Sequence, residues 1–296
     1  MPHPSEYGMS APVRSAGPVE TDWSPTLRTA VLIGLVWTCL MWPPQGDAAG
    51  WREVRGDHFV VSYQDDRGRG FAKETLQRAE EYFDRINADL GFDHATKSEN
   101  LALWRWDNRC RIRLHRDREA YVAETGAPAW SAGFVNPRER VLHSYGGSDG
   151  FLASVLPHEL AHIFLRELVG FDNPGVPTWL SEGVAQYAED GRRRESVERM
   201  RRMLADGVYL PFQRFHEMTT RHLTPDGARL FYVQAASVVH FFVESYGSKR
   251  FVELLKGLRD GHPIERALSF ATSSRIDSLD LLEEKWLAFY IEDSRE

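Results

Sequence analysis

The sequence predicts an α+β fold in which a strand-rich lobe, residues 49–170, precedes a helical lobe, residues 171–296. Two observations lead to this prediction. Apolar residues alternate with polar ones at two places before residue 115, and they recur at helical spacing from about residue 150 onward. Strands followed by helices are typical of α+β chains, whereas a doubly wound sheet alternates the two.

The strands are expected in the first half of the chain. Apolar and polar residues alternate over 58–63 and again over 110–115, and between them apolar residues recur at helical spacing from Phe71 to Leu90. Residues 131–142 enclose an Asn-Pro turn signal and predict a short hairpin or an edge strand pair. Beyond Gly191 the period is helical, most clearly over 231–246 and 279–291.

The composition is that of an ordinary globular chain. Hydrophobic residues make up 42% and charged residues 27% of the 296 residues, enough for one substantial core. The formal net charge is -7 and both signs are interspersed, so no dense basic stripe is available to bind a phosphate backbone. We therefore expect no nucleic-acid partner.

The first 48 residues resemble a secretory leader. A polar, Pro-rich opening leads through Arg28 into an apolar run, residues 30–42, and small residues follow up to Ala48. As a helix this run spans about 20 Å, less than the roughly 30 Å hydrocarbon core of a bilayer. We expect cleavage near Ala48 and a secreted, periplasmic or envelope-associated protein. One alternative is an uncleaved N-terminal anchor, which would be the only part of the chain in contact with the membrane. The other is a buried core helix.

Cysteine cannot supply a metal site in the mature chain, because only Cys110 remains after cleavage and it lies in a predicted strand core. Histidine and carboxylate can. The segment His158-Glu159-Leu160-Ala161-His162 places two imidazoles four residues apart, on one helix face, where both can bind one tetrahedral ion. Glu159 lies beside that face and can reach a metal-bound water. Pro157, directly before His158, must either begin or kink the helix.

A carboxylate stands downstream in the segment Thr178-Trp179-Leu180-Ser181-Glu182-Gly183-Val184-Ala185-Gln186-Tyr187. Two histidines and one carboxylate make a catalytic zinc set with one open position. The two segments together resemble the gluzincin zinc metallopeptidases, in particular the peptidase MA-like family. This resemblance implies a thermolysin-like catalytic domain with the zinc site between the lobes. It also implies one zinc ion per chain, with His158, His162 and Glu182 as ligands and Glu159 as the catalytic base.

A third segment, beginning Tyr232-Val233-Gln234-Ala235-Ala236, is similar to the segment that carries the transition-state tyrosine of gluzincin aminopeptidases. The resemblance implies that Tyr232 donates a hydrogen bond to the oxyanion. The strand that reads a free amino terminus in those aminopeptidases has no counterpart here. In its place stand Gly133 and Phe134, which we expect to line a substrate-binding edge strand. Gln186 and His143 are expected to contact the metal ligands on the side away from the ion.

The sequence therefore predicts a zinc-dependent peptidase acting on peptide or protein substrates, in which Glu159 activates a metal-bound water. One alternative is a non-catalytic, zinc-stabilised binding or assembly module of the cell envelope. Another is a membrane-anchored scaffold that displays the helical lobe. Intact Glu159 speaks against the non-catalytic module, because binding zinc for structure has no use for that carboxylate.

Overall fold

We describe a computed structural model of the chain. It divides into two units, Met1–Ala48 and Ala49–Glu296, and the residues it describes are 50–93, 108–127, 131–136, 141–146, 150–189 and 191–292. The expected leader therefore lies outside the described residues. Among the described helices, none is both long enough and apolar enough to cross a membrane.

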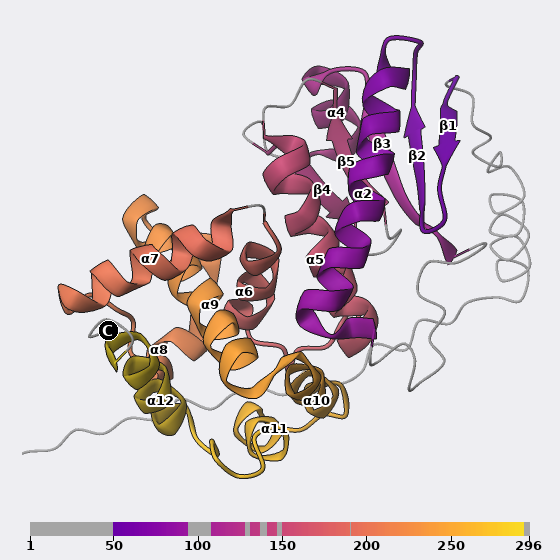
Figure 1. The fold of residues 1–296 in the computed structure, drawn as a ribbon. Helices are drawn as coiled ribbons and strands as arrows, with labels where there is room; N and C mark the ends of the chain where they lie inside the picture. The colour runs from indigo at the N-terminus through magenta and orange to yellow at the C-terminus, as the bar shows by residue number, and fades with distance from the viewer. Residues whose placement is uncertain are drawn as a thin grey trace, which may run out of the picture. The chain divides into compact units, whose positions relative to one another are not determined.

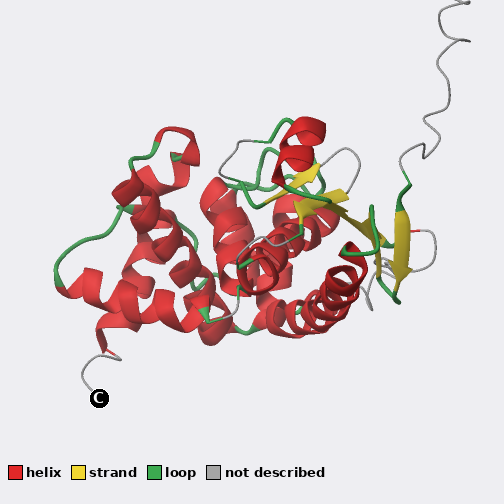
Figure 2. Cartoon of the chain, turned by 90° about the horizontal axis from the view of Figure 1, so that it is seen from above, coloured by secondary structure: helices red, strands yellow, loops and turns green. Residues whose placement is uncertain are grey.

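The second unit begins with a five-stranded mixed sheet and three helices (Figures 1 and 2). Its elements are β1 (Arg52–Arg55), β2 (Phe59–Tyr63), α2 (Gly68–Leu90), β3 (Cys110–His115), α4 (Arg118–Thr125), β4 (Gly133–Asn136), β5 (Val141–Tyr145), the π-helical turn η2 (Phe151–Val155) and α5 (Leu156–Val169).

The strand order is β1-β2-β3-β5-β4, which places β1 and β4 at the two edges. Strands β2, β3 and β5 are parallel, and the edge strands pair antiparallel with their neighbours. Of the two expected arrangements the short hairpin fits better, since β4 and β5 are consecutive and antiparallel, and of these two strands β4 is the one at the edge of the described sheet. The mixed sheet is compatible with an α+β fold, although its parallel centre was not predicted.

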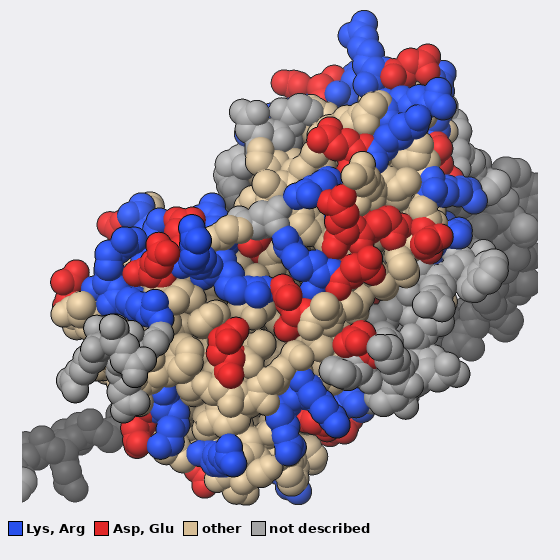
Figure 3. Space-filling model, viewed as in Figure 1, with Lys and Arg blue, Asp and Glu red and all other residues tan. Residues whose placement is uncertain are grey.

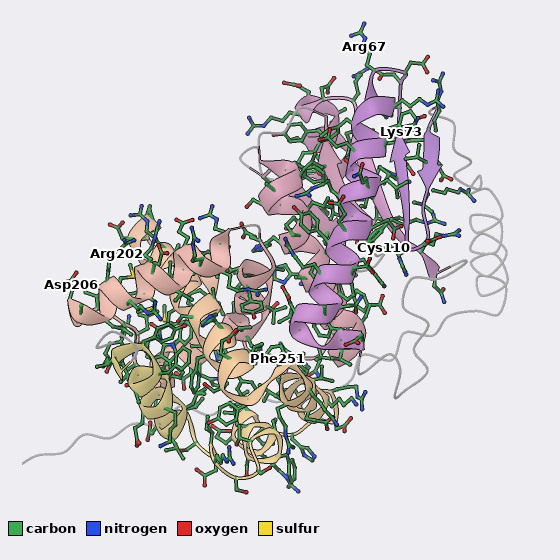
Figure 4. All side chains as sticks on the ribbon, in the orientation of Figure 1. Arg67, Lys73, Cys110, Arg202, Asp206 and Phe251 are labelled. Atoms are coloured by element: carbon green, nitrogen blue, oxygen red, sulfur yellow. The ribbon has the colours of Figure 1, made fainter. Side chains whose placement is uncertain are left out.

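Alternating side chains of β2 and β3 enter the core, as their sequence pattern predicts. Phe59, Val61 and Tyr63 of β2 are buried, and Phe59 packs edge-on against Phe83 of α2. Cys110 is a buried free thiol on β3, and burial raises its pKa (Figure 4). The prediction that Cys110 is a core residue is confirmed.

The second half of the unit is helical, as predicted. Its elements are α6 (Thr178–Ala188), α7 (Arg192–Ala205), α8 (Phe212–Glu217), η3 (Thr220–His222), α9 (Pro225–Tyr246), α10 (Ser248–Arg259), α11 (Ile264–Ala271) and α12 (Leu279–Glu292). Helix α5 contacts α2 and β4 on the sheet side and α6 and α10 on the helical side. It therefore connects the two groups of elements.

Pro157 does not begin α5 but stands at its second position, directly behind the π-helical turn η2. In that turn the Leu156 N–H bonds the carbonyl of Phe151, five residues back. A proline ring clashes with the carbonyl four residues before it in a regular α-helix, and the wider turn relieves this clash. The chain thus enters the HELAH segment through a distorted turn, while the α-helical spacing after Pro157 is kept.

Helices α6 and α9 approach closely at Gly183. A Cβ atom at this position would lie 2.5 Å from the backbone oxygen of Ala235. The glycine directly after Glu182 therefore allows α9, which carries Tyr232, to pack against α6. This contact explains in physical terms why a glycine follows the glutamate in the segment Ser181-Glu182-Gly183.

Candidate metal centre

Helix α5 presents His158 and His162 on one face, with ring centroids 4.8 Å apart. Helix α6 presents Glu182 to the same point. Its Oε2 atom lies 3.7 Å from Nε2 of His158 and 3.8 Å from Nε2 of His162. The three ligand atoms all lie within 4.8 Å of one another. A tetrahedral ion with zinc bond lengths needs ligand atoms about 3.3 Å apart, so the three atoms must close by up to about 1.5 Å to bind it.

Each histidine ring is held by its other nitrogen. Nδ1 of His158 lies 2.9 Å from Oε1 of Glu189, and Nδ1 of His162 lies 3.1 Å from Oγ of Ser181. Such partners fix the tautomer and the orientation of a metal-binding imidazole. In both rings Nε2 therefore remains available for an ion, and the donor set fits zinc.

Glu189, like Ser181, is a residue of this centre that the sequence interpretation missed. Its side chain is buried at the end of α6 and accepts a hydrogen bond from Nε2 of Gln186 at 2.7 Å. Ser154 of η2 donates a short hydrogen bond to the same carboxylate, and Arg192 pairs with it at 3.4 Å. The available signal was its spacing, because a residue seven positions after Glu182 lies on the same helix face.

Burial and neighbouring charges shift the pKa values of the carboxylates and histidines of this centre. Burial raises the pKa of Glu159 and of Glu182, while the nearby charge of His158 opposes both shifts. Burial alone would lower the pKa of His158, but the hydrogen bond to Glu189 and the surrounding carboxylates raise it. The pKa of His162 is lowered well below its ordinary value by burial. Shifted pKa values of this kind are common at catalytic sites.

Tyr232 of α9 approaches the same carboxylates. Burial, followed by the charge of Glu182, raises its pKa to about 12, and its hydroxyl hydrogen-bonds Thr220. The structure thus brings together Glu159, Tyr232 and the three expected ligands, from helices α5, α6 and α9.

Gln186 and His143 contact other groups than the ligands we expected. Gln186 hydrogen-bonds Glu189 and so acts on His158 only through that carboxylate. His143 points its Nδ1 to Nε2 of His115, 3.0 Å away on the neighbouring strand. The residues that hydrogen-bond the rings of His158 and His162 are Glu189 and Ser181, and not the expected His143 and Gln186.

The expected substrate strand has a mixed outcome. Phe134 is half-buried on the edge strand β4, where it is paired with His143 of β5. Gly133 is needed for packing, because a Cβ atom there would lie 2.5 Å from Cγ1 of Val155, directly before α5. Ser131 donates a hydrogen bond to the Gly133 carbonyl at 2.7 Å and is itself 3.0 Å from the Tyr121 hydroxyl. The strand is therefore fixed against the start of the metal-binding helix.

Residues 150–292 match the model of the Peptidase MA superfamily. This part of the chain is similar to the Peptidase MA superfamily. The match includes α5, α6 and α9 and leaves the sheet outside it. The match suggests a metallopeptidase-type function, and Peptidase MA proteins are typically metal-dependent. No curated protein gave a significant match to the chain.

The contact between Glu189 and His158 can be tested by mutation. Glu189→Gln keeps the side-chain volume but removes the charge that holds His158. We expect zinc affinity to fall by about 10- to 100-fold, which is typical when a partner of a metal-binding histidine is lost. Competition with a chromophoric chelator measures this affinity.

Glu198→Gln is the matched control, because Glu198 is exposed and, among the described residues, pairs with Arg194 alone, on the same helix α7. Its zinc affinity should equal that of the parent, and circular dichroism should show both variants folded. A folded Glu189→Gln variant with parental zinc affinity would show that Glu189 does not position His158.

Proposed function

We propose that this chain is a zinc-dependent peptidase of the gluzincin type, with a thermolysin-like arrangement of the site. The observation that carries the proposal is the convergence of His158, His162 and Glu182, with Glu159 beside them as a half-buried carboxylate outside the ligand set. Within the described ranges the cluster offers three ligand groups. Three protein ligands are typical of catalytic zinc, whereas structural zinc has four.

His158, His162 and Glu182 would hold the ion. When bound, zinc would polarise the scissile carbonyl and make a water molecule acidic enough to lose its proton near neutral pH. Glu159 then accepts the proton of the attacking water and passes it to the leaving amine. Because its pKa is about 12, the Tyr232 hydroxyl stays protonated at neutral pH and can donate a hydrogen bond to the oxyanion.

The substrate in this proposal is a peptide in extended conformation. Strand β4 has one unpaired edge within the described sheet, and main-chain hydrogen bonds along such an edge can hold a peptide strand. Phe134 is the side chain of β4 that we propose contacts the substrate, and Gly133 holds the strand close to α5. We also propose that the enzyme acts outside the cytoplasm, which rests on the leader-like residues 30–42.

Replacing the proposed base tests the mechanism. Glu159→Gln keeps the volume of the side chain but cannot accept a proton, so peptide cleavage should fall by at least about 100-fold with zinc content unchanged. Digestion of a peptide library, together with metal analysis of the same samples, measures both quantities. A variant as active as the parent would rule out this mechanism. A parent that binds zinc yet cleaves no peptide would favour the non-catalytic envelope module instead.

Removing one hydroxyl tests Tyr232. Tyr232→Phe keeps the ring and its packing, so zinc content should not change. We expect kcat to fall by about 100-fold and KM to change much less, because the lost hydrogen bond belongs mainly to the transition state. Tyr246→Phe, at the C-terminal end of the same helix, is the control and should retain parental kinetics. Equal kcat in both variants would remove Tyr232 from the mechanism.

A further inference from the structure

Arg166 lies on the same face of α5 as Glu159 and His162. It follows Glu159 by seven residues, which places it about 20° from Glu159 around the helix axis and about 10 Å further along it. It follows His162 by four residues, one turn away. Side chains on a helix point back toward its N-terminus, which from Arg166 is the direction of the metal ligands. Arg166 is half-buried, as are His158 and Glu159.

The guanidinium of Arg166 makes no hydrogen bond or ion pair with any residue in the described part of the chain. Other partly buried arginines do have partners. Arg193 pairs with Asp89, and Arg199 with Glu195, each arginine side chain being 33% exposed. A partly buried cation without a partner is unfavourable, and a bound anion would remove that cost.

The charge of Arg166 nevertheless reaches the metal centre. It lowers the pKa of Glu159, Glu182 and His162, which places it within electrostatic range of all three. Neither Glu159 nor Glu182 forms an ion pair with Arg166. In the proposed mechanism Glu182 binds the metal and Glu159 moves protons. The guanidinium is therefore free to bind a third carboxylate that arrives with the substrate.

We propose that Arg166 binds a carboxylate of the peptide substrate, within about two residues of the scissile bond. This inference rests on the proposed function and names its substrate class. An extended peptide advances about 3.3 Å per residue, and the arginine side chain covers part of the 10 Å along the helix. The guanidinium binds a carboxylate through two parallel hydrogen bonds, which gives both affinity and orientation. The carboxylate is either a C-terminal α-carboxylate or the side chain of Asp or Glu.

The experiment uses peptides built on one sequence that the full-length protein cleaves. One pair differs only in a free or amidated C-terminus, one or two residues beyond the scissile bond. A second pair has both ends blocked and carries Glu or Gln at the same distance. We expect one pair to show a preference for the acid of about 10- to 100-fold in kcat/KM, and that pair identifies the source of the carboxylate.

Three variants assign that preference to Arg166. Arg166→Gln should abolish it, and Arg166→Lys should keep a part of it, because lysine retains the charge but not the paired donors. The matched control is Arg194→Gln, because the Arg194 side chain is 89% exposed on α7 and, within the described ranges, pairs with Glu198 alone. The control should keep the full preference. The readout is the ratio of kcat/KM for the acidic and the neutral peptide, because loss of the Arg166 charge also raises the pKa of Glu159 and Glu182 and so affects cleavage of both peptides.

A binding measurement separates this inference from the proposed mechanism. In Glu159→Gln protein, which should bind without cleaving, the acidic peptide should bind about 10- to 100-fold more tightly than its neutral partner by fluorescence anisotropy. The difference should vanish when Arg166→Gln is added. Equal binding of both peptides, or an acid preference that survives Arg166→Gln, would overturn the inference even if the peptidase proposal stands. If Glu159→Gln cleaves as fast as the parent, the proposed mechanism fails, and the acid preference assigned to Arg166 is then judged from the kcat/KM ratios alone.

Discussion

The contact between α5 and α6 is the constraint on which the rest of the site depends. Two histidines on one helix can face one ion because of their spacing alone, but the third ligand must come from a separate element. The hydrogen bonds from Nδ1 of His158 to Glu189 and from Nδ1 of His162 to Ser181 connect the two helices on the side away from the ion. They fix both rings and the position of Glu182 with one set of contacts.

Close packing extends this constraint to α9. Because Gly183 has no side chain, α9 lies against α6, and Tyr232 comes within electrostatic range of Glu182 and Glu159. On the other side, α5 contacts β4, and Gly133 allows that strand to approach Val155. The proposed base, oxyanion donor and substrate strand thus all take their positions from packing against two helices. Acidic and basic side chains are interspersed on the face shown in Figure 3.

Much of the site could be predicted because its chemistry depends on spacing within one helix. The four-residue interval between His158 and His162 fixes their shared face without knowledge of the fold. Glu189 could not be assigned in the same way. It lies on the same helix face as Glu182, yet only the end of α6 and the approach of η2 show that its carboxylate is buried against His158. His143 was expected near the metal from its closeness in sequence, but the parallel pairing of β3 and β5 points it to His115. Alternation predicts strands and not their direction, so the parallel centre of the sheet was not foreseen.

The central claim is that one zinc ion binds to His158, His162 and Glu182. Anomalous diffraction from crystals of the zinc-loaded protein, collected on both sides of the zinc absorption edge, tests it most directly. The account predicts one zinc peak per chain, at about 2.0–2.2 Å from Nε2 of both histidines and from a carboxylate oxygen of Glu182. A zinc ion bound by other residues, or the absence of any anomalous peak between α5 and α6, would contradict it.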